Sequence, residues 1–150
     1  MFHPDHPVLQ TQVIPIVVGA HLRAELGDRQ HANAIRRAIG TWAEKQDATD
    51  PPWPLVCSDL WYLNDTELRV QPTICIGHPD VNAATAALSS RLETAHMQDD
   101  RFLIQLDTEF VDLKCCIWGV DNEGTQEGVN HFISGFLPQF LGSIFGIQTR

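Results

Sequence analysis

Two histidines and three aspartates follow short apolar segments of this 150-residue chain, and side chains of these types can do acid–base or metal chemistry. The histidines are His21 and His78, and the carboxylates are Asp59, Asp107 and Asp121. Imidazole titrates near neutral pH and exchanges protons with a nearby carboxylate, and both groups bind divalent metals. We therefore take these five residues as candidate catalytic groups, with His21, His78 and Asp59 as candidate metal ligands.

These positions also have an ordinary structural interpretation. Aspartate is common in turns and helix N-caps, and any polar turn residue would suit position 78 before Pro79. Two function hypotheses of different classes follow: a non-catalytic binding or protein-interaction domain, and a small metal-dependent hydrolase with a His/Asp cluster. Geometry separates them, because the hydrolase needs both imidazoles in one open cleft beside a carboxylate.

Two glycine-containing loops, at residues 77–82 and 119–125, each lead into a predicted helix. Helix N-termini attract anions through their free amide groups. Neither loop has the spacing of a nucleotide-binding motif, and the aspartates in both would repel a phosphate. We therefore expect no cofactor and assign a binding role to small and polar loop residues, namely Gly77, Asn82, Asn122 and Thr125.

Nucleophilic catalysis has little support in the sequence. There is no GxSxG turn to expose a serine, and no CxxC pair. Burial of a cysteine in an apolar strand raises the thiol pKa and makes the group inert. All four cysteines lie in predicted strands: Cys57, Cys75, Cys115 and Cys116. We expect them to be reduced, to pack as small hydrophobic side chains, and to belong to a cytoplasmic protein.

Short strands that end in glycine must position these side chains. Continuous apolar segments, typical of strands buried on both faces, occupy residues 13–18, 73–76 and 115–118. Two more strands are predicted at 55–58 and 101–106. Only residues 107–113 separate the last two strands in sequence, too few for a helical crossover, so one of them is antiparallel.

The predicted fold class is therefore α/β. We expect a three-layer, Rossmann-like sandwich with about five strands in a mostly parallel sheet and one antiparallel strand. Ligands bind outside the carboxyl ends of the strands in such sheets, which is where the candidate residues lie. Helices are predicted at residues 29–45, with Gly27-Asp28 as a break and N-cap, and at about 81–95.

The last predicted helix, within residues 129–145, has the most regular apolar spacing, with a kink expected at Pro138. No charged residue occurs between Glu127 and Arg150. The uncharged face either packs inside its own domain or forms a homodimer interface. The interface residues would be His131, Ser134, Gly135 and Gln139.

Composition excludes some partners. The net charge of −9 disfavours nucleic acid and anionic membrane surfaces, and the polar residues of the last helix disfavour a membrane span. Residues 1–12 lack the pattern of a secretory signal and are predicted to form a flexible arm, which favours a cytoplasmic protein. Residues 13–150 are predicted to form a single domain.

Two stretches resemble the α/β modules of surface-layer and cell-wall-binding proteins. In those modules a strand runs into a glycine-containing turn, a proline, a Val-Asn pair and a helix, as residues 73–82 do here. Residues 117–125 have a similar glycine-rich exit. The resemblance implies a non-catalytic Rossmann-like domain used for structure or binding.

Overall fold

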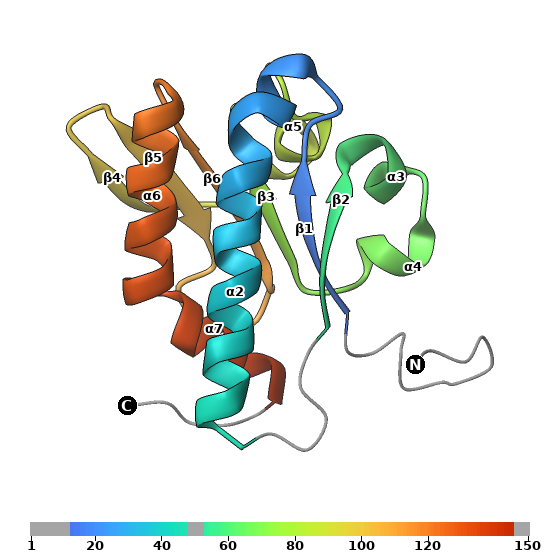
Figure 1. Cartoon of the computed structure of the whole chain (residues 1–150), viewed down its shortest axis with the longest axis vertical. Coiled ribbons are helices and arrows are strands. Elements are labelled where there is room, and N and C mark those ends of the chain that lie inside the picture. Colours follow the sequence, from blue (N-terminus) through green and yellow to red (C-terminus); the bar gives the residue numbers. More distant parts are fainter. Residues whose placement is uncertain (1–12, 48–52, 146–150) are drawn as a thin grey trace.

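A six-stranded sheet forms the centre of the computed structural model, which describes residues 13–47 and 53–145 (Figure 1). The strand order is β2-β1-β3-β6-β5-β4. Strands β1, β2, β3 and β6 pair in parallel, and β5 runs antiparallel to both of its neighbours. The strands are β1 (Val13–Val18), β2 (Trp53–Ser58), β3 (Thr73–Ile76), β4 (Thr94–Gln98), β5 (Phe102–Leu106) and β6 (Lys114–Gly119).

Helices cover both faces of this sheet. Successive strand residues point to opposite faces, so Ile16 and Val18 join one buried cluster while Val17 joins the other. On the first face lie α2 (Arg29–Lys45), α6 (Asn122–Gly135) and α7 (Leu137–Phe145), seen in front of the sheet in Figure 1. On the second lie α3 (Asp59–Leu63), α4 (Thr66–Arg69) and α5 (Ala83–Ser89). This explains why the apolar segments are continuous.

A short π-helix, η1 (Ala24–Asp28), leads directly into α2. The Arg29 amide donates to the Ala24 carbonyl, five residues earlier. Asp28 has helical backbone angles, and its side chain caps no amide of α2. The interpretation of Gly27-Asp28 as a break and an N-cap is therefore wrong. Single π-turns are rare and often mark functional sites.

Two predicted helices have different bounds in the structure. The helix expected at about 81–95 ends at Ser89, and residues 94–98 form the edge strand β4 instead, which is the sixth strand. The expected kink at Pro138 is a complete break two residues earlier, at Phe136. Proline suits the first turn of α7, where its missing N–H has no partner to lose.

Three further predictions concern residues 1–12, membrane-spanning helices and the cysteines. The predicted flexible arm at residues 1–12 lies outside the described residues. Within residues 13–47 and 53–145, no helix is long and apolar enough to cross a membrane. All four cysteines are buried and unpaired, as expected.

Candidate functional site

The carboxyl ends of β1, β3 and β6 meet at one edge of the sheet, because these strands are parallel neighbours. The three exit glycines, Gly19, Gly77 and Gly119, therefore lie along this edge, as the sequence predicted. A cavity of about 580 Å³ opens there. Its lining comes from η1 and the residue before it, the exits of β3 and β6, and the start of α6: Arg23, Leu26, Gly27, Asp28, His78, Asp80, Val81, Gly119, Val120, Asp121, Asn122 and Thr125.

Strand order explains why the cavity opens at this position. The chain leaves β1 through α2 toward β2 and leaves β3 through α5 toward β4, on opposite sides of the β1–β3 pair. Connections that diverge in this way leave a crevice above the carboxyl ends of the two strands, which is where ligands bind in open α/β sheets.

Asp59, a candidate for catalysis and for metal binding, ties two strand exits together. Its side chain is buried, and one carboxylate oxygen accepts the Ala20 amide at 3.0 Å. The other oxygen accepts the Ala83 amide at 2.7 Å. Both oxygens are thus engaged by the backbone of the β1 exit and of α5, so the carboxylate holds the edge together.

Asn82, predicted to bind a ligand, has a similar role. It is fully buried, and its Nδ2 donates to the carbonyls of Val17 and Ile76 at 3.0 and 2.9 Å. Its Oδ1 accepts the amides of Ala84 and Thr85 at the start of α5. The side chain therefore bridges β1 and β3 and caps α5, and it presents no group to the cavity.

The two candidate histidines lie in different environments. His78 lines the cavity; its Nδ1 accepts the Asp80 amide at 3.0 Å and lies 3.5 Å from an Asp80 carboxylate oxygen. His21 is exposed outside the lining, and its Nδ1 accepts the Arg23 amide at 3.1 Å. The structure therefore does not bring both imidazoles into one cleft.

No three His, Cys, Asp or Glu side chains within residues 13–47 and 53–145 are placed to hold a metal ion. The candidate ligands His21, His78 and Asp59 accordingly form no such group. For Asp59 the physical reason is visible, because both of its oxygens already accept backbone amides.

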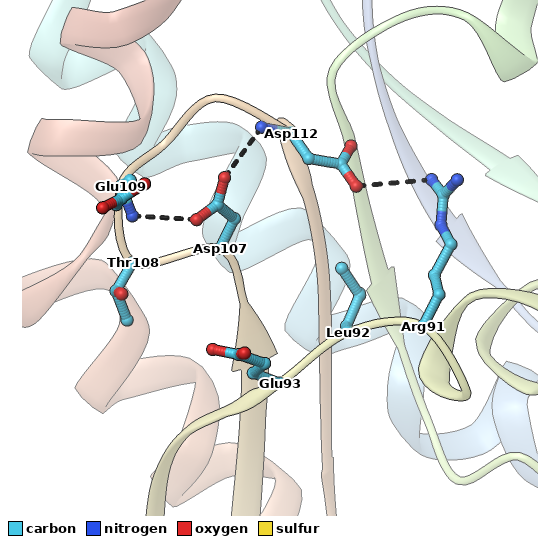
Figure 2. Close-up of a pocket in the computed structure, with 7 residues that line it drawn as sticks. All are labelled: Arg91, Leu92, Glu93, Asp107, Thr108, Glu109 and Asp112. Carbon is cyan, nitrogen blue, oxygen red and sulfur yellow. Dashed lines mark hydrogen bonds and ion pairs between the residues drawn. The ribbon is translucent and has the colours of Figure 1, made fainter.

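Asp107, another candidate, lies at the opposite edge of the sheet because β5 runs antiparallel to β6. Figure 2 shows its carboxylate turned into its own loop, where it accepts the amides of Glu109 and Asp112. It also accepts the Val111 amide, and all three distances are 2.9 to 3.0 Å. These backbone hydrogen bonds lower its pKa. The side chain therefore organises a turn.

That turn and the segment before β4 border a second cavity, of about 440 Å³. Figure 2 shows its lining, in which Asp112 pairs with Arg91 at 3.7 Å. The remaining lining residues are Leu92, Glu93, Asp107, Thr108 and Glu109.

The start of α6 forms one wall of the first cavity. Asp121 is the N-cap of α6, and its Oδ1 accepts the Gly124 amide at 2.7 Å. Thr125 Oγ1 accepts the Gly119 amide and donates to the Asp121 carbonyl, which closes the turn. Asn122 Oδ1 lies 2.9 Å from Nε2 of the buried His31 in α2.

Asp28, which the sequence analysis placed in a cap, is the unusual group of this cavity. Its carboxyl group is half-buried and accepts no hydrogen bond from any described residue. Burial raises its pKa to about 6, against an opposing effect of the charges of His31 and Arg23. Strongly raised carboxyl pKa values in a cavity are typical of functional sites.

The backbone of β3 makes room for this carboxyl group. Gly77 has a φ of +117°, and a Cβ there would lie 2.5 Å from an Asp28 carboxyl oxygen. Any side chain at position 77 would therefore be strained and would collide with Asp28. The predicted binding residue Gly77 thus contributes by the absence of a side chain.

A signal for Asp28 exists in the sequence. The buried face of α2 includes Ala32, Ile35 and Ile39, and a helical step of four residues back from Ala32 is Asp28. An acidic residue on the apolar face of a helix is costly unless it has a use. This spacing identifies Asp28 more directly than its proximity to Gly27 does.

Comparisons of the chain with protein-family models, with curated proteins and with solved structures give no significant match.

Proposed function

We propose that this chain is a non-catalytic binding domain with a Rossmann-like, three-layer α/β fold, and that the cavity above β1, β3 and β6 holds a small polar ligand. The observation that carries the proposal is the half-buried Asp28 carboxyl group, which lines this cavity without a hydrogen-bond partner among the described residues. A fold keeps such a group against its cost where it is needed for binding.

Binding is favoured over metal-dependent hydrolysis by the other side chains. Of the two histidines, His78 alone lines the cavity, and Asp59 is engaged by two backbone amides. The resemblance of residues 73–82 to surface-layer modules points in the same direction, toward a structural or binding domain.

The experiment is a thermal-shift screen of small polar compounds against the wild-type chain and a variant with an obstructed cavity. Val120 lines the cavity and is 66% exposed, so Val120→Trp places a large ring at its mouth without disturbing the core. Val111 is 81% exposed in the loop at the opposite edge, so Val111→Trp is the matched control.

We expect compounds that stabilise the wild-type chain and Val111→Trp but not Val120→Trp. Ligands that stabilise all three proteins equally would place binding elsewhere and contradict the proposal.

We also propose that the chain forms a homodimer through α6 and α7. Ser134, Gly135 and Gln139 are exposed on the uncharged part of this surface, which follows Glu127. The half-buried His131 stacks on His96 of its own chain, with 3.9 Å between ring centroids. A dimer mass in size-exclusion chromatography with light scattering supports the proposal. Ser134→Arg should give monomers, and Ser90→Arg, at the C-cap of α5, should not. A wild-type monomer at micromolar concentration would contradict the proposal.

A further inference from the structure

The charges around the cavity indicate what kind of ligand fits. Among the described lining residues, three carry carboxyl groups, namely Asp28, Asp80 and Asp121. Against them stand the guanidinium of Arg23 and the imidazole of His78. Because carboxyl groups outnumber basic groups in this lining, the cavity attracts cations and repels phosphate or carboxylate ligands.

Asp28 is the carboxyl group that lacks a partner. The Asp80 carboxylate is exposed to solvent, 3.5 Å from His78 Nδ1, and Asp121 accepts an amide of α6. Arg23 affects Asp28 through its charge, but within the described part of the chain no cation lies within 4 Å of the Asp28 carboxyl group. A ligand that brings a charged N–H donor would supply the missing partner, in a charge-assisted hydrogen bond.

We infer that the ligand is a small organic cation with an ammonium or amidinium group, and that this group binds the Asp28 carboxylate in the cavity. The inference rests on the proposed function and adds the chemical class of the ligand. Asp121, which accepts one amide through Oδ1 alone among the described residues, and Asp80 supply the surrounding negative potential.

Binding of such a cation should depend on pH. The Asp28 pKa is about 6, so the cation displaces a proton below that pH. The charged or titratable groups around Asp28 are His31 on α2, Arg23 before η1, His78 and Asp80 after β3, and Asp121 before α6. With the carboxyl group about nine-tenths protonated at pH 5, affinity should be about tenfold weaker there than at pH 7.

The probes are three four-carbon compounds that differ in charge: 1,4-diaminobutane, 1,4-butanediol and succinate. Each is titrated into the ¹⁵N-labelled chain at pH 7 and pH 5, and the amide signals of Gly77, Gly119 and Asn122 report on the cavity. The variant is Asp28→Asn. The control Asp47→Asn makes the same change of charge just after α2, at the end far from η1.

We expect only the diamine to shift the three signals at pH 7, with affinity reduced tenfold or more in Asp28→Asn and within twofold of wild type in Asp47→Asn. If the diol or succinate binds at least as well as the diamine, or if Asp28→Asn binds the diamine unchanged, the inference is overturned and the proposed binding function stands. If no probe shifts these signals and the thermal-shift screen also gives no cavity ligand, both are overturned.

Discussion

Asp28 and Asp107 are both aspartates beside a cavity, at opposite edges of the same sheet, and their environments are reversed. Asp107 accepts three amides of its own loop, which lower its pKa (Figure 2). Asp28 accepts none from the described residues, and burial raises its pKa to about 6. The same residue type therefore stabilises the fold at one edge and costs stability at the other.

The comparison teaches how to separate a structural carboxylate from a functional one. Hydrogen bonds from backbone amides satisfy a carboxylate and give it a place in the fold. A carboxyl group that is desolvated without such bonds is retained at a cost in stability, and for Asp28 we propose ligand binding as the reason. Asp59, with two backbone amides, belongs with Asp107 on this criterion.

The largest expected effect is that of Asp59→Ala. The substitution leaves the amides of Ala20 and Ala83 without their acceptor at a buried position, so we expect a loss of about 3 kcal/mol in the free energy of unfolding. Urea denaturation followed by circular dichroism measures it. A change of less than about 0.5 kcal/mol would show that hydrogen bonds from backbone amides do not identify a carboxylate that stabilises the fold.

The next effect is a gain in stability. Asp28→Asn removes a charge that the fold buries, so at pH 7 we expect stabilisation of about 1 kcal/mol, a figure reduced for the partial exposure of the group. Because the folded-state pKa of about 6 lies above the ordinary 3.8, the wild type loses stability relative to the variant as pH rises from 4 to 7.

The pH dependence is measured by thermal denaturation of the wild type, Asp28→Asn and Asp47→Asn at each pH. Destabilisation of Asp28→Asn at pH 7 would mean that the carboxylate is satisfied in the folded chain, and the contrast with Asp107 would be lost.

The smallest effect is that of Asp107→Asn, because this side chain is only partly buried and its hydrogen bonds lie within one loop. Its lowered folded-state pKa means that its contribution is present above about pH 4 and is lost as pH falls further. We expect a lower Tm for the variant at pH 7 and equal Tm values at pH 2.5. An unchanged Tm at both pH values would indicate that the amide bonds of this loop do not depend on the charge.

The parts of the fold that the sequence predicted are those with one dominant physical cause. Residues 13–18, 73–76 and 115–118 are continuous apolar segments, and only strands covered on both faces explain them. The sequence failed at β4, where the segment Thr94–Gln98 is an edge strand with two exposed residues at its end and no apolar alternation. This segment becomes a strand because it pairs with β5, and a pattern within residues 94–98 alone cannot reveal that pairing.

The sequence could place a candidate residue at the cavity only where it also predicted the direction of the preceding strand. His78, Asp121, Asn122 and Thr125 follow parallel strands and line the cavity as their positions suggest. Asp107 follows the one strand that runs antiparallel, so the same rule puts it at the wrong edge. The helical spacing from Ala32 marks Asp28 as a residue on an apolar face. Its place in the cavity depends also on η1 and on the close approach to Gly77, which that spacing does not contain.

The protonation of the Asp28 carboxyl group is the property that most directly distinguishes it from the structural carboxylates. A titration of the ¹³Cγ signal of Asp28 by NMR, in the free chain and with saturating 1,4-diaminobutane, tests it. We predict a pKa of about 6 in the free chain and a clearly lower pKa with the diamine bound. A free-chain pKa near the ordinary 3.8, unchanged by the diamine, would contradict the claim that Asp28 is an unsatisfied group kept for a cationic ligand.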